Sequence, residues 1–119
     1  MDASLVGAYG ELVTGVYLRK HGCKIVDVNY RSRFGEIDVI AKNSRHMIFC
    51  EVKTRSSHGA ISAADAVDAG KRKRIVLTVQ KFLARYGIRL QPRLDVAEVY
   101  LDGDEVAEFN YIKNAYTLD

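Results

Sequence analysis

Residues 4–20 carry apolar side chains at helical spacing, and this pattern predicts an α-helix that stops at Gly22. The apolar positions that indicate the helix include Leu5, Leu12 and Val16. Three glycines lie inside it, and each costs about 1 kcal/mol of helix propensity. They are Gly7, Gly10 and Gly15. We therefore expect close packing against a neighbouring element to compensate for them.

Alternating apolar and polar positions then predict strands. Residues 23–30 form the first strand, and residues 31–35 form a basic loop. Residues 36–53 are two apolar runs separated by a polar break at 43–46, which is typical of a β-hairpin. The connection over residues 54–61 is rich in Ser and Gly, and we expect it to be mobile.

A second helix follows, because residues 62–65 resemble a helix N-cap and the helical pattern extends to about residue 86. Its apolar face, expected in the core, consists of Ile75, Val79, Phe82, Leu83 and Tyr86. An adjacent stripe fits either phosphate contacts or an ordinary solvated face, and it consists of Lys71, Arg74, Thr78, Lys81 and Arg85. Residues 93–101 and 105–109 predict a strand and its return, and residues 111–116 predict a short closing helix.

The hairpin over residues 36–53 places two carboxylates opposite one another. Its turn is centred between Ser44 and Arg45. Residues whose numbers sum to 89 then face each other, so Asp38 lies opposite Glu51 on the same face of the pair. The period-2 alternation puts Lys53 on that face as well. The hairpin therefore predicts a cluster of two acids and a lysine.

Two carboxylates about 4 Å apart repel by roughly 4 kcal/mol at an effective dielectric constant near 20, so a positive partner is needed. Lys53 is one candidate, and a divalent cation with oxygen ligands is another. The surrounding run is more apolar than a freely solvated face, which favours a functional site. The alternative is a solvated trio in which Asp38 and Glu51 each pair with an exposed Lys or Arg.

Charge is segregated along the chain. The net charge is +3, but residues 1–93 carry +9 and residues 94–119 carry −6. A basic segment of this size attracts a polyanion such as nucleic acid, although solvated basic runs are also common. The 48% hydrophobic content suits a single domain over residues 1–119. The absence of a Gly-rich phosphate loop argues against a nucleotide-binding enzyme.

Cysteine usage and the apolar runs indicate the compartment. No basic leader precedes the first helix, and the longest apolar stretch, residues 47–50, is far shorter than a signal sequence or a membrane span. We therefore expect a cytoplasmic protein. Cys23 and Cys50 form no CxxC pair, so small buried thiols are favoured over a disulfide. The four-ligand spacing of a zinc site is missing around His21 and Cys23.

Several segments together resemble the YraN family of poorly characterised bacterial proteins, and the resemblance spans nearly the whole chain. They are Gly35-Glu36-Ile37-Asp38-Val39-Ile40-Ala41, Glu51-Val52-Lys53-Thr54-Arg55, Gly10-Glu11, Leu94-Asp95-Val96, Asn29-Tyr30-Arg31 and Ile112-Lys113-Asn114-Ala115-Tyr116. That family is similar to the PD-(D/E)xK nuclease superfamily, especially archaeal Holliday junction resolvases. The resemblance implies an α/β fold with a restriction-endonuclease-like core, in which helices flank a central mixed β-sheet.

The resemblance also implies roles for single residues. Asp38 matches the aspartate of the motif, Glu51 its second acid and Lys53 its lysine. Glu11 matches the acid on the first helix, where the residue pattern alone favours a surface carboxylate. Glu36 belongs to the Gly-Glu-Ile-Asp signature of the family and is expected to tune the site or to bind a second cation.

The implied cofactor is Mg²⁺ or Mn²⁺, which prefers oxygen ligands and keeps several waters. The expected ligands are Asp38, Glu51, the Val52 carbonyl and Glu11. Such an ion lowers the pKa of a bound water and stabilises charge that develops on the phosphate, while Lys53 orients or helps to deprotonate the water. The departure from the superfamily pattern is Ile37, which stands where a proline is loosely kept.

The sequence and the resemblance together predict a metal-dependent endonuclease that hydrolyses DNA, with branched or Holliday-junction-like structures as the candidate substrates. The residues expected to bind nucleic acid are Arg31, Arg33, Arg55, Lys71 and Arg74. One alternative is a noncatalytic nucleic-acid-binding protein that keeps the nuclease fold, and another is an interaction subunit that docks a partner through the acidic region from Asp95 onward. Resolvase-like proteins commonly act as dimers, but no segment of this sequence identifies a dimer surface.

Overall fold

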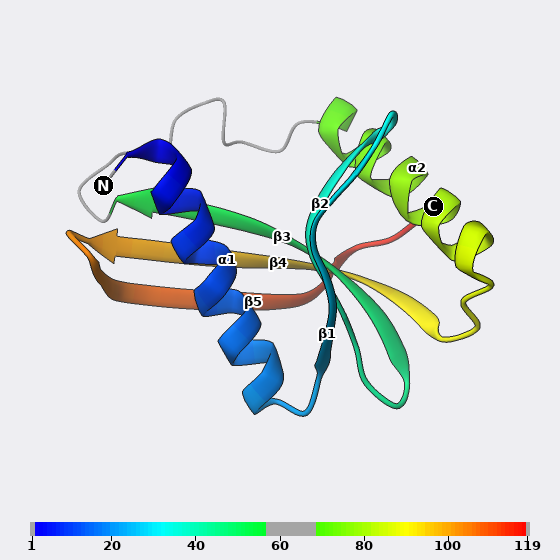
Figure 1. Ribbon diagram of the computed structural model, residues 1–119, viewed down its shortest axis with the longest axis horizontal. Helices are drawn as coiled ribbons and strands as arrows, with labels where there is room; N and C mark the ends of the chain where they lie inside the picture. Colours follow the sequence, from blue (N-terminus) through cyan, green and yellow to red (C-terminus); the bar gives the residue numbers. More distant parts are fainter. Residues whose placement is uncertain (1, 57–68, 119) are drawn as a thin grey trace.

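The computed structural model describes residues 2–56 and 69–118, and within them two helices and five strands follow one another (Figure 1). They are α1 (Ala3–Lys20), β1 (Lys24–Ser32), β2 (Gly35–Lys42), β3 (His46–Ser56), α2 (Ala69–Tyr86), β4 (Gln91–Asp102) and β5 (Glu105–Tyr116). The strands form one sheet in the order β1-β2-β3-β4-β5. Strands β3 and β4 are parallel, and the other neighbours are antiparallel. The predicted fold class, an α/β protein with helices flanking a central mixed sheet, is confirmed.

The two faces of the sheet are covered by different helices. Met47 and Phe49 of β3 pack in one apolar cluster with Phe82 of α2. Ile48 and Cys50, which alternate with them along the strand, pack in a second cluster with Leu18 of α1. Because successive side chains of a strand point to opposite faces, α1 and α2 lie on opposite faces of the sheet. In Figure 1, α1 crosses one half of the sheet and α2 covers the other end.

Helix α1 matches its predicted bounds, but the apolar residues that indicated it do not face the sheet. The residues that it buries are small or lie near its C-terminal end: Gly10, Thr14 and Leu18. Gly10 lies so close to the side chain of Thr54 on β3 that a Cβ there would collide with it. The expected close packing is thus confirmed for Gly10, whereas a Cβ added at Gly7 would meet nothing within 4 Å. By contrast, Leu5, Leu12 and Val16 are exposed, so the apolar pattern marks the outer side of the helix.

Helix α2 is confirmed from Ala69 onward, while the predicted N-cap at residues 62–65 and most of the predicted connection at 54–61 lie outside the described residues. Ile75, Val79 and Phe82 are buried as predicted. Tyr86 is exposed, so its assignment to the core is wrong.

Thr78 does not belong to the solvated stripe of α2. It is buried, and its hydroxyl donates a hydrogen bond to the Arg74 carbonyl at 2.8 Å. A Cβ added at Gly35 would meet Thr78, which shows that this side of α2 packs against the start of β2. The stripe expected to face phosphates is therefore interrupted at this position.

The C-terminal segment is the clearest structural error of the prediction. Residues 111–116 continue β5 instead of forming a helix. The strand is irregular there, because Leu94 pairs with Tyr116 whereas Val96 pairs with Ile112. Asn114 has a φ of 54°, and its N–H donates to the Asp95 carboxylate of β4 at 2.9 Å. A bulge of this kind has no signature in the local apolar pattern.

Two further expectations concern single features. Cys23 and Cys50 are both free thiols, and Cys50 is fully buried while Cys23 is half-buried. Among the described residues, no helix combines the length and the apolar character that crossing a membrane requires.

Candidate metal and nucleic-acid site

Strands β2 and β3 pair in the predicted register. Val39 pairs with Cys50 and Lys42 with Met47, so paired residue numbers sum to 89. The described ladder ends at Val39 and Cys50. Asp38 and Glu51 are the next residues along, and they therefore lie where the two strands part.

The backbone around Asp38 departs from a regular strand. Ile37 packs in the apolar cluster under α2, whereas Val39 packs in the cluster under α1. Strict alternation would place both on one face. Asn29, the residue of β1 that the register would pair with Asp38, has a φ of 56° and makes no pair in the ladder. The chain thus changes face at Asp38 and leaves this side chain at the junction of the two layers.

Asp38 substitutes for a missing backbone acceptor. Its Oδ2 accepts a hydrogen bond of 2.8 Å from the Val52 N–H of β3, which β2 no longer reaches with its own carbonyls. Burial of the carboxyl raises the pKa of Asp38 from 3.8 to about 6. The negative charges of Glu11 and Glu36 also raise this pKa, while the Val52 N–H and the charge of Lys71 lower it. The surroundings thus disfavour the charged form of this carboxylate, and a nearby positive charge favours it.

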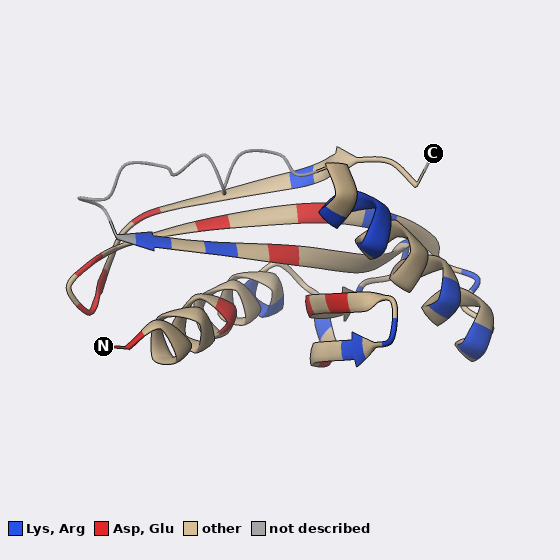
Figure 2. Ribbon diagram, turned by 90° about the horizontal axis from the view of Figure 1, so that it is seen from above, with Lys and Arg blue, Asp and Glu red and all other residues tan. Residues whose placement is uncertain are grey.

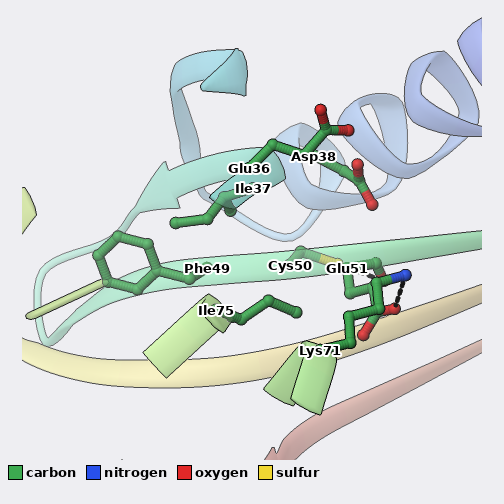
Figure 3. Close-up of a pocket in the computed structure, with 8 residues that line it drawn as sticks. All are labelled: Glu36, Ile37, Asp38, Phe49, Cys50, Glu51, Lys71 and Ile75. Atoms are coloured by element: carbon green, nitrogen blue, oxygen red, sulfur yellow. Dashed lines mark hydrogen bonds and ion pairs between the residues drawn. The ribbon is translucent and has the colours of Figure 1, made fainter. Parts of the chain in front are cut away.

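Asp38 and Glu51 line one cavity of about 50 Å³ (Figure 3). Glu51 is the less exposed part of an ion pair there. Its side chain is 10% exposed, and its Oε1 lies 2.7 Å from the Nζ of Lys71 on α2. Burial lowers the pKa of Lys71, but the hydrogen bond and the negative charge of Glu51 outweigh this effect, and the pKa is raised overall. An ammonium group therefore already offsets the charge of one of the two acids.

Lys71 takes the position that sequence reasoning expected for Lys53. Among the described residues, no hydrogen bond or ion pair joins Lys53 to either acid, although Lys53 lies on the same strand two residues beyond Glu51. The sequence did contain a signal for Lys71. It stands four residues before the buried Ile75, and thus on the inner side of α2 one turn before the core begins. A lysine in line with an apolar stripe has a partner more often than a lysine on the outer face does.

The other two predicted acids flank the cavity. Glu11 comes from α1, and its Oε1 accepts a hydrogen bond of 3.1 Å from Asn29 Nδ2. It acts on Asp38 through its charge. Glu36 also lines the cavity, but its half-exposed side chain pairs with Arg31, with 3.4 Å between Nε and Oε2. The structure therefore brings Asp38 and Glu51 together and leaves Glu11 and Glu36 at the margins.

The donor groups fit a hard divalent ion in part. Two carboxylates line one cavity, and a backbone segment at Val52 lies beside them. Mg²⁺ needs few protein ligands because it retains several waters. Over residues 2–56 and 69–118, however, no three acidic, His or Cys side chains converge closely enough to hold a metal ion together. The arrangement suits an ion held by Asp38 and Glu51 with water, rather than the larger set that includes Glu11.

A basic cleft adjoins the acidic cavity. It runs between the β1–β2 turn and α2, and the residues that line it are Arg31, Ser32, Gly35, Glu36, Lys71, Arg74 and Ile75. Figure 2 shows the Lys and Arg residues gathered on α2. At the tip of the turn, the centroid of the Phe34 ring lies 4.9 Å from the Arg33 guanidinium carbon and 5.6 Å from Lys81 Nζ. The predicted contacts Arg31, Arg33, Lys71 and Arg74 thus share one end of the molecule.

Arg55 lies further along β3. Its Nη1 donates to the Thr54 carbonyl at 3.0 Å, and its positive charge acts on Lys71. It lies four residues beyond Glu51 on this strand and is not among the residues that line the acidic cavity or the basic cleft.

Asp95 lies on the face of the sheet that α1 covers, opposite the face of α2 and the basic cleft, and it has a structural role. It is 1% exposed. Its Oδ2 accepts hydrogen bonds from Nε and Nη2 of Arg93 and, at 2.6 Å, from the Tyr111 hydroxyl. Its Oδ1 accepts hydrogen bonds from Nε of Arg93 and, at 2.9 Å, from the backbone N–H of Asn114. This carboxylate cannot reach a partner protein. The exposed acids of the C-terminal part lie instead around the β4–β5 turn (Figure 2).

Comparison with known proteins gives one consistent family. The family model described as "Uncharacterised protein family UPF0102" matches residues 10–99. A UPF0102 protein of Syntrophotalea carbinolica is 43% identical over 117 residues, which cover 96% of this chain and 93% of that protein. A UPF0102 protein of Caldanaerobacter subterraneus is 39% identical over 119 residues, with 98% of each chain covered.

One solved structure is similar in outline. It is "The structure of Pyrococcus Furiosus SfsA in complex with Ca2+", with a TM-score of 0.44 and 17% sequence identity. The match covers 94% of this chain and spans 64% of that chain.

Proposed function

The chain belongs to the uncharacterised protein family UPF0102, as the YraN resemblance predicted, and from this premise we propose that it is a metal-dependent endonuclease that hydrolyses DNA phosphodiester bonds, branched DNA in particular. The observation that carries the proposal is the pair Asp38 and Glu51. Both carboxylates line one small cavity at the point where β2 and β3 part, and a basic cleft opens beside it. Paired acids next to a phosphate-attracting surface are the parts that hydrolysis of a phosphodiester requires.

In this proposal, each residue of the site would have a separate role in the reaction. Asp38 and Glu51 would hold Mg²⁺ or Mn²⁺, which when bound lowers the pKa of a water and stabilises negative charge on the phosphate. The Val52 N–H keeps the Asp38 carboxylate aimed into the cavity through its 2.8 Å hydrogen bond. Lys71, once displaced from Glu51 by the ion, would stand beside the cavity with a free ammonium group for the substrate phosphate. Lys53 keeps its proposed role toward the attacking water.

The proposed substrate path follows the cleft between the β1–β2 turn and α2. Arg31 and Arg74 line this cleft and Arg33 flanks it, so a backbone that crosses it would meet several cations before it reaches Asp38. The residues that line this cleft include cations but no aromatic ring on which a base could stack, so the cleft suits the phosphate backbone rather than the bases. Recognition by shape, as for a branched duplex, suits such a surface.

The test is cleavage of labelled four-way junction, flap, duplex and single-stranded DNA with Mg²⁺ or Mn²⁺. We expect the wild type to cut at least one substrate, and Asp38→Ala and Lys53→Ala to lose at least 100-fold in rate. Asp104→Ala, which changes an exposed acid in the β4–β5 turn, is the matched control and should cut like the wild type. A folded wild type that cuts none of these DNAs with either metal would contradict the proposal.

A second candidate is a noncatalytic DNA-binding protein of the same fold. It is favoured by the Lys71–Glu51 ion pair, which neutralises an acid without any metal, and by the lack of a third acidic ligand among the described residues. Binding of DNA that is unchanged by chelator and by Asp38→Ala, together with no cleavage, would establish this second reading.

A further inference from the structure

The outer side of α1 carries a row of apolar residues that the fold leaves exposed. Leu5 is 56% exposed, Leu12 is 65% exposed and Val16 is 43% exposed, and the half-buried Tyr9 stands between them. We call these four residues the α1 stripe. Their numbers are separated by four, three and four, which is the spacing of the two core positions of a coiled coil. Burial of an exposed apolar row with this spacing against another helix is more favourable than its exposure to water.

The α1 stripe is not a misplaced part of the core. The sheet-facing side of α1 is occupied by Gly10, Thr14 and Leu18, and these lie on the opposite side of the helix cylinder. Gly10 has no room for a side chain against Thr54, so the helix cannot rotate to bury larger residues there. The stripe therefore stays outside as long as α1 packs on this sheet.

The α1 stripe is complementary to itself when the second helix runs in the opposite direction. A pairing in which residue numbers sum to 21 sets Leu5 of one copy against Val16 of the other. The same register sets Tyr9 against Leu12. At each end it brings Asp2 of one copy to the exposed Arg19 of the other, so opposite charges meet at both ends of the row. Running the second helix in the same direction would instead set Asp2 against Asp2.

We propose that the α1 stripe binds the α1 stripe of a second copy of this chain, in an antiparallel two-fold dimer. The contact is a single pair of helices about 27 Å long, because 18 residues rise about 1.5 Å each. Interfaces of this size are at the weak end for proteins, so we expect a dissociation constant on the order of 10 to 100 µM. Helix α2 packs on the other face of the sheet, and the basic cleft beside it stays open in the dimer.

The first test is sedimentation velocity of the full chain over a concentration range that spans about 100 µM. We expect the wild type to shift from monomer to dimer, and Leu12→Glu to remain a monomer at every concentration. Leu77→Glu is the matched control, because it makes the same change at another exposed leucine, on α2, and it should dimerise like the wild type. Circular dichroism checks that both variants fold. A monomeric wild type, or a Leu12→Glu that dimerises like the wild type, would overturn the proposal.

The second test addresses the direction of the helices. Leu5→Cys and Val16→Cys are made separately in a Cys23→Ser background and oxidised alone or mixed. In the proposed register the mixture forms a disulfide between the two variants at least 10-fold faster than either forms one with itself, because only residues 5 and 16 of different copies approach. Faster self-linkage of either variant would overturn the antiparallel arrangement. Neither test depends on DNA cleavage, so the dimer and the proposed nuclease activity stand or fall separately.

Discussion

At the scale of single residues, Asp38 has one contact that stabilises the folded state and one property that destabilises it. It satisfies the Val52 N–H at the end of the β2–β3 ladder, which stabilises the fold. It also keeps a carboxylate in a largely buried position next to other acids, which raises its pKa to about 6. The Val52 N–H stabilises the charged carboxylate, while burial and the neighbouring acids destabilise it.

The pH dependence of stability follows from this shift. The folded protein holds the Asp38 proton more tightly than the unfolded chain does, because the pKa is about 6 when folded and 3.8 in the ordinary state. The contribution of Asp38 to stability therefore falls as the pH rises from about 4 to 6, by up to about 3 kcal/mol. Asp38→Asn has no such proton and keeps an acceptor for Val52. We expect urea denaturation without metal to show it about 2 kcal/mol more stable than the wild type at pH 7.5, and equal near pH 4. A difference that does not change with pH would contradict this.

At the scale of elements, α1 is held to the sheet by the smallness of its inner side. Gly10 approaches Thr54 on β3, and the Thr54 hydroxyl is buried without a hydrogen-bond partner among the described residues. This close contact positions Glu11, the next residue, near Asn29 and Asp38. The glycine thus sets the depth at which an acid of α1 reaches the cavity.

Two glycine substitutions separate this packing effect from helix propensity. Gly10→Ala places a methyl group on the Thr54 side chain, and we expect a loss of about 1 to 3 kcal/mol in the free energy of unfolding. Gly7→Ala meets nothing within 4 Å, so the gain in propensity should stabilise the protein by about 0.5 to 1 kcal/mol. Thermal and urea unfolding of the two variants measure both values. Changes of the same sign would show that α1 does not pack on β3 as described.

At the scale of the whole molecule, charge is divided between two ends. Basic side chains gather on α2 and the β1–β2 turn, and acidic ones gather around the β4–β5 turn (Figure 2). This division follows the order of charges along the chain, +9 before residue 94 and −6 after it. A polyanion would therefore be drawn to the end that carries the acidic cavity and repelled from the other.

The salt dependence of DNA binding tests this division. Each phosphate neutralised contributes about −0.9 to the slope of log affinity against log salt concentration. We expect Arg74→Gln, in the basic cleft, to reduce the magnitude of the slope by about 1. Lys113→Gln, which removes an exposed lysine of β5, should leave the slope unchanged. Fluorescence anisotropy at several salt concentrations measures both, and an equal effect of the two variants would place the DNA elsewhere.

The sequence by itself determined the elements that local order specifies. The β2–β3 register and the bounds of α1 followed from spacing, because turn length and side-chain period depend on neighbouring residues alone. The nearness of Asp38 to Glu51 followed from the same register. The family also followed, from motifs that are contiguous in the chain.

Only the tertiary structure decided which groups meet across elements. Lys71 reaches Glu51 from another element, the outer side of α1 is the apolar one, and residues 111–116 extend β5 around the buried Asp95. Each of these depends on contacts between residues far apart in sequence, which override local propensity when they bury charge or close a sheet. Local pattern specifies backbone geometry, whereas the partner of a side chain is set by which elements the fold brings together.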